Sequence, residues 1–223
     1  MLSFIENIGL ILQRYGAVFA QGLWNTLWLS FVSVFLGTFL GILVALGKLS
    51  RHKLLNGVVS TYIEIIRGTP ILLQLYFFWL ALPNILPSIS DTTCILSALV
   101  VNASAYIAEV IRAGIQAVDA GQREASLSLG MTERAIMTKV IFPQAIKNIL
   151  PALGNEVIVM IKQTSLASVF FFGELMTAYK QVQSTTFLAL EPLNISGLIY
   201  LFLTVTLSRI TRHFEKRMKQ NER

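Results

Sequence analysis

Two pairs of opposite charge interrupt apolar stretches of this sequence. Glu64 and Arg67 are three residues apart, and so are Glu109 and Arg112. Residues at this spacing are neighbours on one face of an α-helix, so we expect each pair to neutralise itself within its own helix. A charged side chain at the centre of a bilayer costs about 2.5 to 3.5 kcal/mol on insertion scales, so each of these charges needs a partner or a function. Arg112 can also mark the end of an apolar span.

A third set of polar residues has a different spacing. Glu156 and Lys162 are six residues apart and do not face each other along one helix, so we expect their partners on other helices or in a cavity. The hydroxyl residues Thr164 and Ser165 follow them. A carboxylate, a basic group and hydroxyls in one cavity can bind a small charged ligand through charge-assisted hydrogen bonds. Ion pairs between helices would use the same residues, so both alternatives stay open.

Motifs for covalent or metal chemistry are absent from the sequence. It contains no HExxH, GxSxG or CxxC, and the lone Cys94 offers no cysteine cluster for a metal. The stretch GILVALGKL, residues 41–49, superficially resembles a phosphate-binding loop. It has five residues between its glycines, and Leu49 stands where Ser or Thr must bind Mg²⁺. We therefore expect neither an enzyme nor a cofactor-binding chain.

The composition indicates a membrane protein. Hydrophobic residues make up 54% of the 223 residues and charged residues only 13%, whereas soluble domains contain about 25% charged residues. The apolar residues come in blocks near the ~20 that a helix needs to cross a bilayer. Because lipid admits only helices and closed barrels, long apolar blocks predict an all-α polytopic membrane protein.

Five membrane spans can be placed on this pattern, at about 23–46, 55–82, 93–118, 149–172 and 193–207. The second span contains the turn-prone sequence RGTP, from Arg67 to Pro70, with Thr69 inside it. Pro70 removes one backbone hydrogen bond and Gly68 loosens the turn. The carbonyl groups that are freed can line a cavity, or the sequence can simply bend the helix.

The distribution of basic residues orients these spans. Fourteen Lys and Arg residues lie after the first span, in the segment from Arg112 to Lys147 and in the C-terminal tail, whereas the opposite face has only Arg14 and Lys180. The positive-inside rule therefore predicts an outside N-terminus and a cytoplasmic C-terminus, with residues 209–223 as a basic tail. Residues 1–20 carry apolar residues at helical spacing and are expected to lie in the membrane interface. The bias explains the formal net charge of +6 without nucleic acid.

A polar passage, DAGQREASLSLGMTERAIMTKVIFPQA, fills residues 119–145 between the third and fourth spans. Asp119 can cap a first short helix, Gly130 suits the left-handed residue that ends it, and Thr132 can cap a second. Pro143 limits how far the second helix runs undisturbed. The expected product is a rigid, bent helix pair in the cytoplasm. An ordinary loop between two capped helices would carry the same signals.

This passage resembles the EAA loop of the membrane subunits of ABC importers. The family pattern is Glu-Ala-Ala, three residues, Gly, nine residues and Ile-x-Leu-Pro, and the corresponding positions here are Glu124, Ala125, Ser126, Gly130 and Pro143. Ser126 is a conservative departure. RGTP, AYIAEVIRAG at 105–114 and IKQTSLAS at 161–168 resemble the polar amino acid permeases of that superfamily, in which two glycines usually follow the Arg of the second motif. The likeness runs from about residue 21 to residue 214.

The resemblance implies a function and a set of partners. In the family, the EAA loop is the coupling helix that docks on a separate ATPase subunit, which uses ATP and Mg²⁺. The chain would be the permease subunit of an importer of polar amino acids in the bacterial cytoplasmic membrane. A second permease subunit, identical or different, and an extracytoplasmic substrate-binding protein would complete the transporter. The candidates for its substrate path are Glu156, Lys162, Thr164, Ser165, Arg67, Thr69, Glu64 and Glu109.

Two other functions compete with this interpretation. Charges inside the spans also suit an ion-driven secondary transporter, and a membrane scaffold could recruit a cytoplasmic partner through the same loop. No residue selects one amino acid over another. If the two permease subunits differ, the substrate site can lie in the other subunit, and Glu156 and Lys162 would then be structural.

Overall fold

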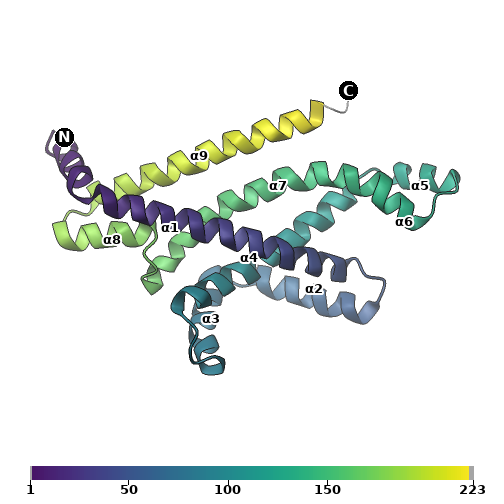
Figure 1. Ribbon diagram of the computed structural model, residues 1–223, viewed down its shortest axis with the longest axis horizontal. Coiled ribbons are helices and arrows are strands. Elements are labelled where there is room, and N and C mark those ends of the chain that lie inside the picture. The colour runs from purple at the N-terminus through teal and green to yellow at the C-terminus, as the bar shows by residue number, and fades with distance from the viewer. Residues whose placement is uncertain (1, 221–223) are drawn as a thin grey trace.

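The computed structural model describes residues 2–220, and all regular elements in this range are helical. This confirms the all-α class. The α-helices of the described residues, labelled in Figure 1, are α1 (Leu2–Lys48), α2 (Lys53–Gly68), α3 (Ile71–Ile85), α4 (Asp91–Gln116), α5 (Ala120–Ser128), α6 (Glu133–Ile136), α7 (Phe142–Gln163), α8 (Leu175–Thr186) and α9 (Leu190–Gln220). A π-helical turn, Met137–Ile141, precedes α7, and a 3₁₀ segment, Thr164–Phe170, follows it.

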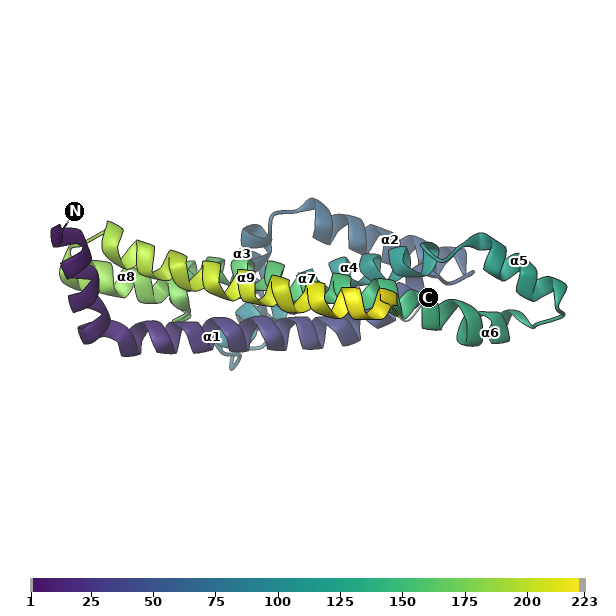
Figure 2. The same cartoon turned by 90° about the horizontal axis from the view of Figure 1, so that it is seen from above.

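The long helices α1, α4, α7 and α9 extend along the long axis of the molecule (Figures 1 and 2). Helix α4 packs against α1 and α7, and α7 also packs against α9. Two glycines allow α1 to approach α4 closely: a Cβ added to Gly37 would lie 2.6 Å from Cβ of Ala103, and one added to Gly41 would lie 2.9 Å from Cγ2 of Ile107. Small residues permit this contact because lipid offers no hydrophobic driving force between helices, so close packing stabilises them.

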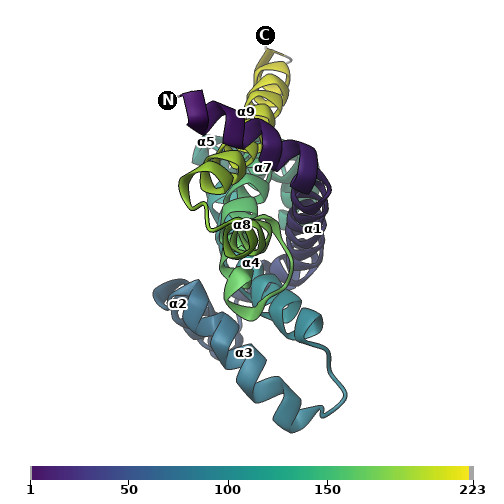
Figure 3. The ribbon, with the colours of Figure 1, turned by 90° about the vertical axis from the view of Figure 1, so that its left-hand side faces the viewer.

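The main core lies where α1, α3, α4 and α7 meet. Its buried members include Leu29, Leu75, Ile95, Leu99 and Met160. Helices α2 and α3, by contrast, stand to one side of the bundle when it is viewed along its long axis (Figure 3). Their exposed apolar side chains suit a hydrocarbon solvent, since a membrane protein has no need to bury apolar surface away from lipid.

The predicted spans correspond to the helices in different ways. Among the described residues, α1, α4 and α9 are long and apolar enough to cross a membrane, and they contain the predicted spans 23–46, most of 93–118 and 193–207. Helices α2 and α3 meet at an angle of 108°, and the helical stretch 133–170 meets α8 at 46°. The count reaches five only if each bent pair is one span, so five spans and their orientation stay predictions.

The two ends of the chain belong to long helices. Helix α1 continues without a break through residues 2–20, although its first turns are bent away from the rest (Figure 2). Ile11 and Phe19 of this part pack with α8 and α9. The basic segment that begins at Arg209 is helical as far as Gln220, and residues 1 and 221–223 lie outside the described range.

Candidate functional site

The polar passage between α4 and α7 folds as the bent helix pair that its cap residues predict. The Asp119 carboxylate accepts a hydrogen bond from the Gly121 N–H at 2.6 Å and begins α5. Gly130 has a φ of +75°, and the N–H groups of Gly130 and Met131 bond back to the carbonyls of Leu127 and Ser126. This pair of bonds is a Schellman motif, which requires a left-handed residue that glycine adopts without a steric penalty.

A second cap and an ion pair complete the bend. The Thr132 hydroxyl accepts a hydrogen bond from the Ala135 N–H at 3.3 Å and begins α6. Arg123 of α5 forms an ion pair with Glu133 of α6, although both side chains are about half exposed. Exposed ion pairs contribute at most about 1 kcal/mol, so the caps and the glycine do more to set the angle.

Pro143 disturbs the second helix without ending it. Because proline has no N–H, the regular hydrogen-bond ladder cannot continue through it. The chain responds with the π-helical turn Met137–Ile141, in which the Phe142 N–H bonds to the Met137 carbonyl. Helical backbone therefore runs from Glu133 through Gln163, and the short helix α6 is rigidly joined to the long helix α7.

The α5 helix presents two different faces. Ser126 is buried, and its hydroxyl donates to the Gln122 carbonyl at 2.7 Å. Glu124 and Ala125 are exposed, and Leu129 at the end of the helix is 82% exposed. The helix pair projects beyond one end of the bundle (Figure 1), so its outer face is open to another molecule. Leu129 was missed in the sequence; the signal that could have found it is a large apolar residue beside the terminating glycine.

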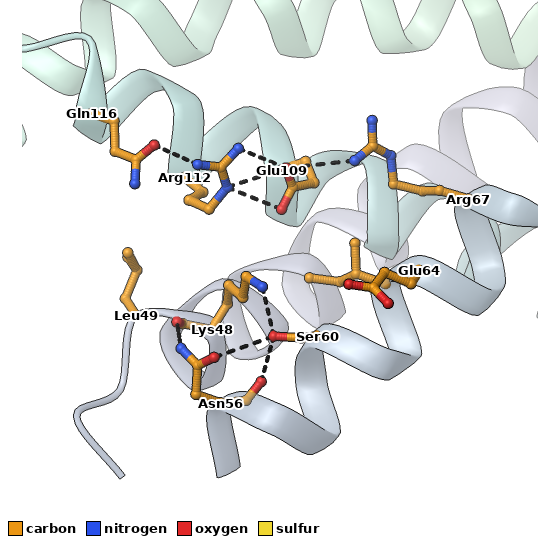
Figure 4. A pocket seen from close by; sticks show the side chains of 10 residues that line it. Lys48, Leu49, Asn56, Ser60, Glu64, Arg67, Glu109, Arg112 and Gln116 are labelled. Carbon is orange, nitrogen blue, oxygen red and sulfur yellow. Dashed lines mark hydrogen bonds and ion pairs between the residues drawn. The ribbon is translucent and has the colours of Figure 1, made fainter. Parts of the chain in front are cut away.

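A polar cavity of about 430 Å³ lies between the end of α1, helix α2 and the end of α4 (Figure 4). The Arg112 guanidinium holds the Glu109 carboxylate with two nitrogens, at 3.0 Å from Nε to Oε1 and 2.8 Å from Nη2 to Oε2. This confirms the pairing of these two residues within α4. The complete lining is Lys48, Leu49, Asn56, Ser60, Ile63, Glu64, Arg67, Glu109, Arg112 and Gln116.

The expected pairing of Glu64 with Arg67 is wrong. Arg67 lies in the last turn of α2 and reaches across to α4, where its Nη1 is 3.5 Å from Oε2 of Glu109 and its guanidinium lies over the Tyr106 ring. Glu64 forms no ion pair within the described part of the chain. The reason is geometric, because the bend after α2 brings Arg67 to a carboxylate on another helix that spacing along α2 could not reveal.

The charged residues of α7 are divided between two environments. Glu156 is half-buried and close enough to Arg67 for an electrostatic interaction. Arg67 and Glu109 form an ion pair between two helices, whereas Glu156 on α7 forms no ion pair within the described residues and does not line the polar cavity. Lys162 is exposed and forms no ion pair within the described residues.

The two hydroxyl residues after Lys162 bond to their own backbone. Thr164 is fully buried and donates to the Ile161 carbonyl at 2.8 Å, and Ser165 donates to the Lys162 carbonyl at 2.6 Å. Neither residue lines the polar cavity of Figure 4. Each hydroxyl oxygen keeps its capacity to accept a hydrogen bond.

The RGTP bend is held by a buried amide network that the sequence did not reveal. The Gln74 Nε2 lies 2.7 Å from the Ile66 carbonyl, 3.1 Å from the Thr69 carbonyl and 2.9 Å from the Thr69 hydroxyl, and its two N–H groups are shared among these three acceptors. Asn102 of α4 donates to the Gln74 carbonyl oxygen at 2.9 Å and orients it. The backbone carbonyls of Ile66 and Thr69 therefore have a hydrogen-bond donor in Gln74, and these bonds stabilise the bend. The available signal was two uncharged amides inside apolar spans.

Comparison with known proteins assigns the family. The family model described as "Binding-protein-dependent transport system inner membrane component" matches residues 37–220, most of the chain. The chain belongs to this family. The permease is 38% identical over 203 residues to the arginine transport system permease protein ArtQ of Bacillus subtilis, which covers 91% of this chain and 93% of ArtQ. It is 36% identical to the glutamine transport system permease protein GlnP of Escherichia coli, with 89% and 92% covered.

Solved structures agree with this assignment. The permease superposes on a chain of "an amino acid ABC transporter with histidines" with a TM-score of 0.90, at 48% identity, covering 93% of this chain and 97% of that one. A chain of an inward-facing methionine ABC transporter, MetNI, shares the fold at 21% identity, with a TM-score of 0.76 and coverage of 90% and 96%. The permease is therefore an integral membrane protein and a subunit of a transport system, and its family implies ATPase and substrate-binding protein partners.

Proposed function

We propose that this permease is the membrane subunit of a bacterial importer that carries a polar amino acid into the cytoplasm at the expense of ATP hydrolysed by a partner. Relatives named for arginine and glutamine transport support the substrate class. The observation that carries the proposal is that the coupling loop continues as helical backbone from α6 into α7. An exposed capped helix is joined through a fixed bend to a helix that reaches the charged residues of the bundle.

In this mechanism, α5 docks on the cytoplasmic ATPase through its exposed face, with Glu124 and Ala125 at the contact. Ser126 packs inward, Gly130 sets the angle, and Pro143 marks the π-turn through which motion enters α7. A displacement of the ATPase would then move α7 as a lever, since packed helices shift as rigid bodies. The fourteen basic residues predicted for one face support a cytoplasmic position for this loop.

The proposed substrate path is centred on Arg67 of α2 and Glu156 of α7. An amino acid presents a carboxylate and an ammonium group, and a guanidinium with an adjacent carboxylate can hold both by charge-assisted hydrogen bonds. Glu109 orients Arg67 from α4. The remaining candidates would extend this path in two directions. Glu64 and Thr69 lie in and just after α2, and Lys162, Thr164 and Ser165 lie at the end of α7 and just after it.

The path would be completed by a second permease subunit, identical or different. The apolar window of α9 is only 11% buried in this chain, which leaves a long apolar face for lipid or for a partner. A substrate-binding protein would deliver the amino acid at the outer end. ATP and Mg²⁺ belong to the ATPase in this scheme.

Reconstitution tests the proposal directly. Proteoliposomes would contain the permease, its ATPase and its binding protein, and uptake of radiolabelled arginine, glutamine and histidine would be compared with and without internal ATP. We expect uptake that requires ATP and the binding protein and that resists an uncoupler. Uptake that persists without the ATPase but stops with the uncoupler would show an ion-driven transporter, and a complex that binds the ATPase without accumulating any amino acid would show a scaffold.

A further inference from the structure

The lining of the polar cavity carries more positive than negative charge. Lys48, Arg67 and Arg112 line the cavity with only Glu64 and Glu109 as carboxylates. Arg112 and Arg67 both bind Glu109, so one carboxylate is already shared between two guanidinium groups. The cavity therefore keeps an excess of cationic donors.

Lys48 contributes most directly to this excess. Its Nζ donates to the Ser60 hydroxyl at 2.5 Å, and that hydroxyl in turn donates to the Asn56 carbonyl at 2.6 Å (Figure 4). An ammonium group has three N–H donors, so this bond leaves two for another ligand. No carboxylate in the described part of the chain forms an ion pair with Lys48.

Helix α2 has two contrasting faces beside this cavity. Asn56, Ser60, Glu64 and Arg67 recur at intervals of four, four and three residues and form a polar stripe along the cavity. On the rest of its surface, α2 exposes apolar side chains: Leu54 is 72% exposed, Leu55 46%, Val58 62% and Ile65 57%. A ligand that binds here meets donors for an anion and, beside them, apolar surface suited to hydrocarbon.

We propose that the mouth of this cavity, formed by Lys48, Asn56, Arg112 and Gln116, binds the phosphate of an anionic phospholipid from the cytoplasmic leaflet. Basic pockets between membrane helices on the cytoplasmic side bind lipid headgroups in this way. The lipid's acyl chains lie along the exposed apolar residues of α2. The volume of about 430 Å³ falls in the range of about 300 to 1,000 Å³ that small-molecule sites occupy.

The inference rests on the orientation given with the proposed function, which places the ends of α1 and α4 in the cytoplasm. A bound lipid would hold α2 against the ends of α1 and α4, beside the Arg67–Glu109 contact. It is a site distinct from the ATPase contact on α5, because none of the cavity's lining residues belongs to α5 or α6.

Native mass spectrometry of the full-length permease in detergent can measure this binding without ATP, ATPase or transport. The protein would be titrated with phosphatidylglycerol and, separately, with phosphatidylcholine of the same chain length. We expect phosphatidylglycerol to bind more tightly. Lys48→Gln should weaken its binding about fivefold, the effect of one basic contact near a membrane surface. Lys53→Gln removes an exposed charge that does not line the cavity and should leave binding within twofold.

A change in the opposite direction controls for damage to the fold. Glu64→Gln removes an unpaired negative charge from the lining and should tighten phosphatidylglycerol binding by a few fold. Equal binding of the two lipids, or equal loss in Lys48→Gln and Lys53→Gln, would overturn the proposal. Displacement of the lipid by millimolar inorganic phosphate or by free arginine would overturn the assignment to a lipid. Because uptake is measured separately, a lost lipid site leaves the transport proposal standing, and the converse also holds.

Discussion

The loop between α5 and α6 and the RGTP bend are both sharp turns between helices, yet they are stabilised in opposite ways. At the loop, Asp119, Gly130 and Thr132 act on backbone groups within five residues of themselves. At the bend, Gln74 and Asn102 act across 28 residues and join α3 to α4. An exposed turn can rely on local caps, whereas carbonyl groups near a buried turn need partners from other segments, because water cannot reach them there.

The largest expected effect comes from removing the amide at the bend. Gln74→Leu leaves the carbonyls of Ile66 and Thr69 without their buried donor, and each unsatisfied group costs about 1 to 3 kcal/mol. We expect a loss of about 3 kcal/mol in the free energy of unfolding, measured by denaturant titration in detergent micelles. Gln13→Leu, at an exposed position of α1, is the matched control and should change it little. Equal stability of the two variants would show that the RGTP bend does not depend on the long-range bonds of Gln74.

The next effect tests the local turn. Gly130→Val forces a β-branched residue to a φ of +75°, at a cost of about 1 to 2 kcal/mol. We expect ATPase co-purification and ATP-driven uptake to fall about tenfold, because 1.4 kcal/mol corresponds to a factor of ten. Gly57→Val provides the control, since a Cβ there meets no atom within 4 Å and the backbone is helical. Unchanged docking and uptake in Gly130→Val would contradict the coupling role.

A smaller effect is expected at the polar cavity. Glu109→Gln weakens contacts with both Arg67 and Arg112, although all three side chains keep some exposure and solvent screens their charges. We expect a loss of about 1 kcal/mol in unfolding free energy, with a larger relative loss of uptake. Glu124→Gln, on the exposed face of α5, should keep the unfolding free energy and isolate any effect on docking. If Glu124→Gln lowered the unfolding free energy as much as Glu109→Gln, the cavity contacts would not be more important for stability than the exposed face of α5.

The smallest effect is expected at the exposed ion pair of the loop. Arg123→Ala removes the contact with Glu133, and exposed pairs of this kind contribute about 0.2 to 1 kcal/mol. Helix content by circular dichroism and uptake should both stay within twofold of the unaltered permease. A loss comparable to that of Gly130→Val would mean that the ion pair, rather than the left-handed glycine, sets the angle between α5 and α6.

Sequence reasoning succeeded where the decisive interactions are local. The cap at Asp119, the left-handed glycine and the Glu109–Arg112 pair all join residues within four positions of one another, or depend on the preference of a single residue. The Glu64–Arg67 pairing failed because spacing on one helix ignores neighbours on others. The role of Gln74 was missed for the same reason, since an amide inside an apolar span becomes informative only when its acceptors are located.

The sequence by itself determined that the chain is a membrane protein, that it is all-helical, and that residues 119–145 form a bent helix pair. Composition and apolar block length decide which medium a chain can occupy, and local caps decide where short helices begin and end. Only the tertiary structure decided how charges on different helices meet. Arg67 and Glu109 come from two helices and form an ion pair, and Lys48 and Arg112 share a cavity from two more distant segments. Packing sets these contacts, because the position of one helix against another depends on side chains that are far apart along the chain.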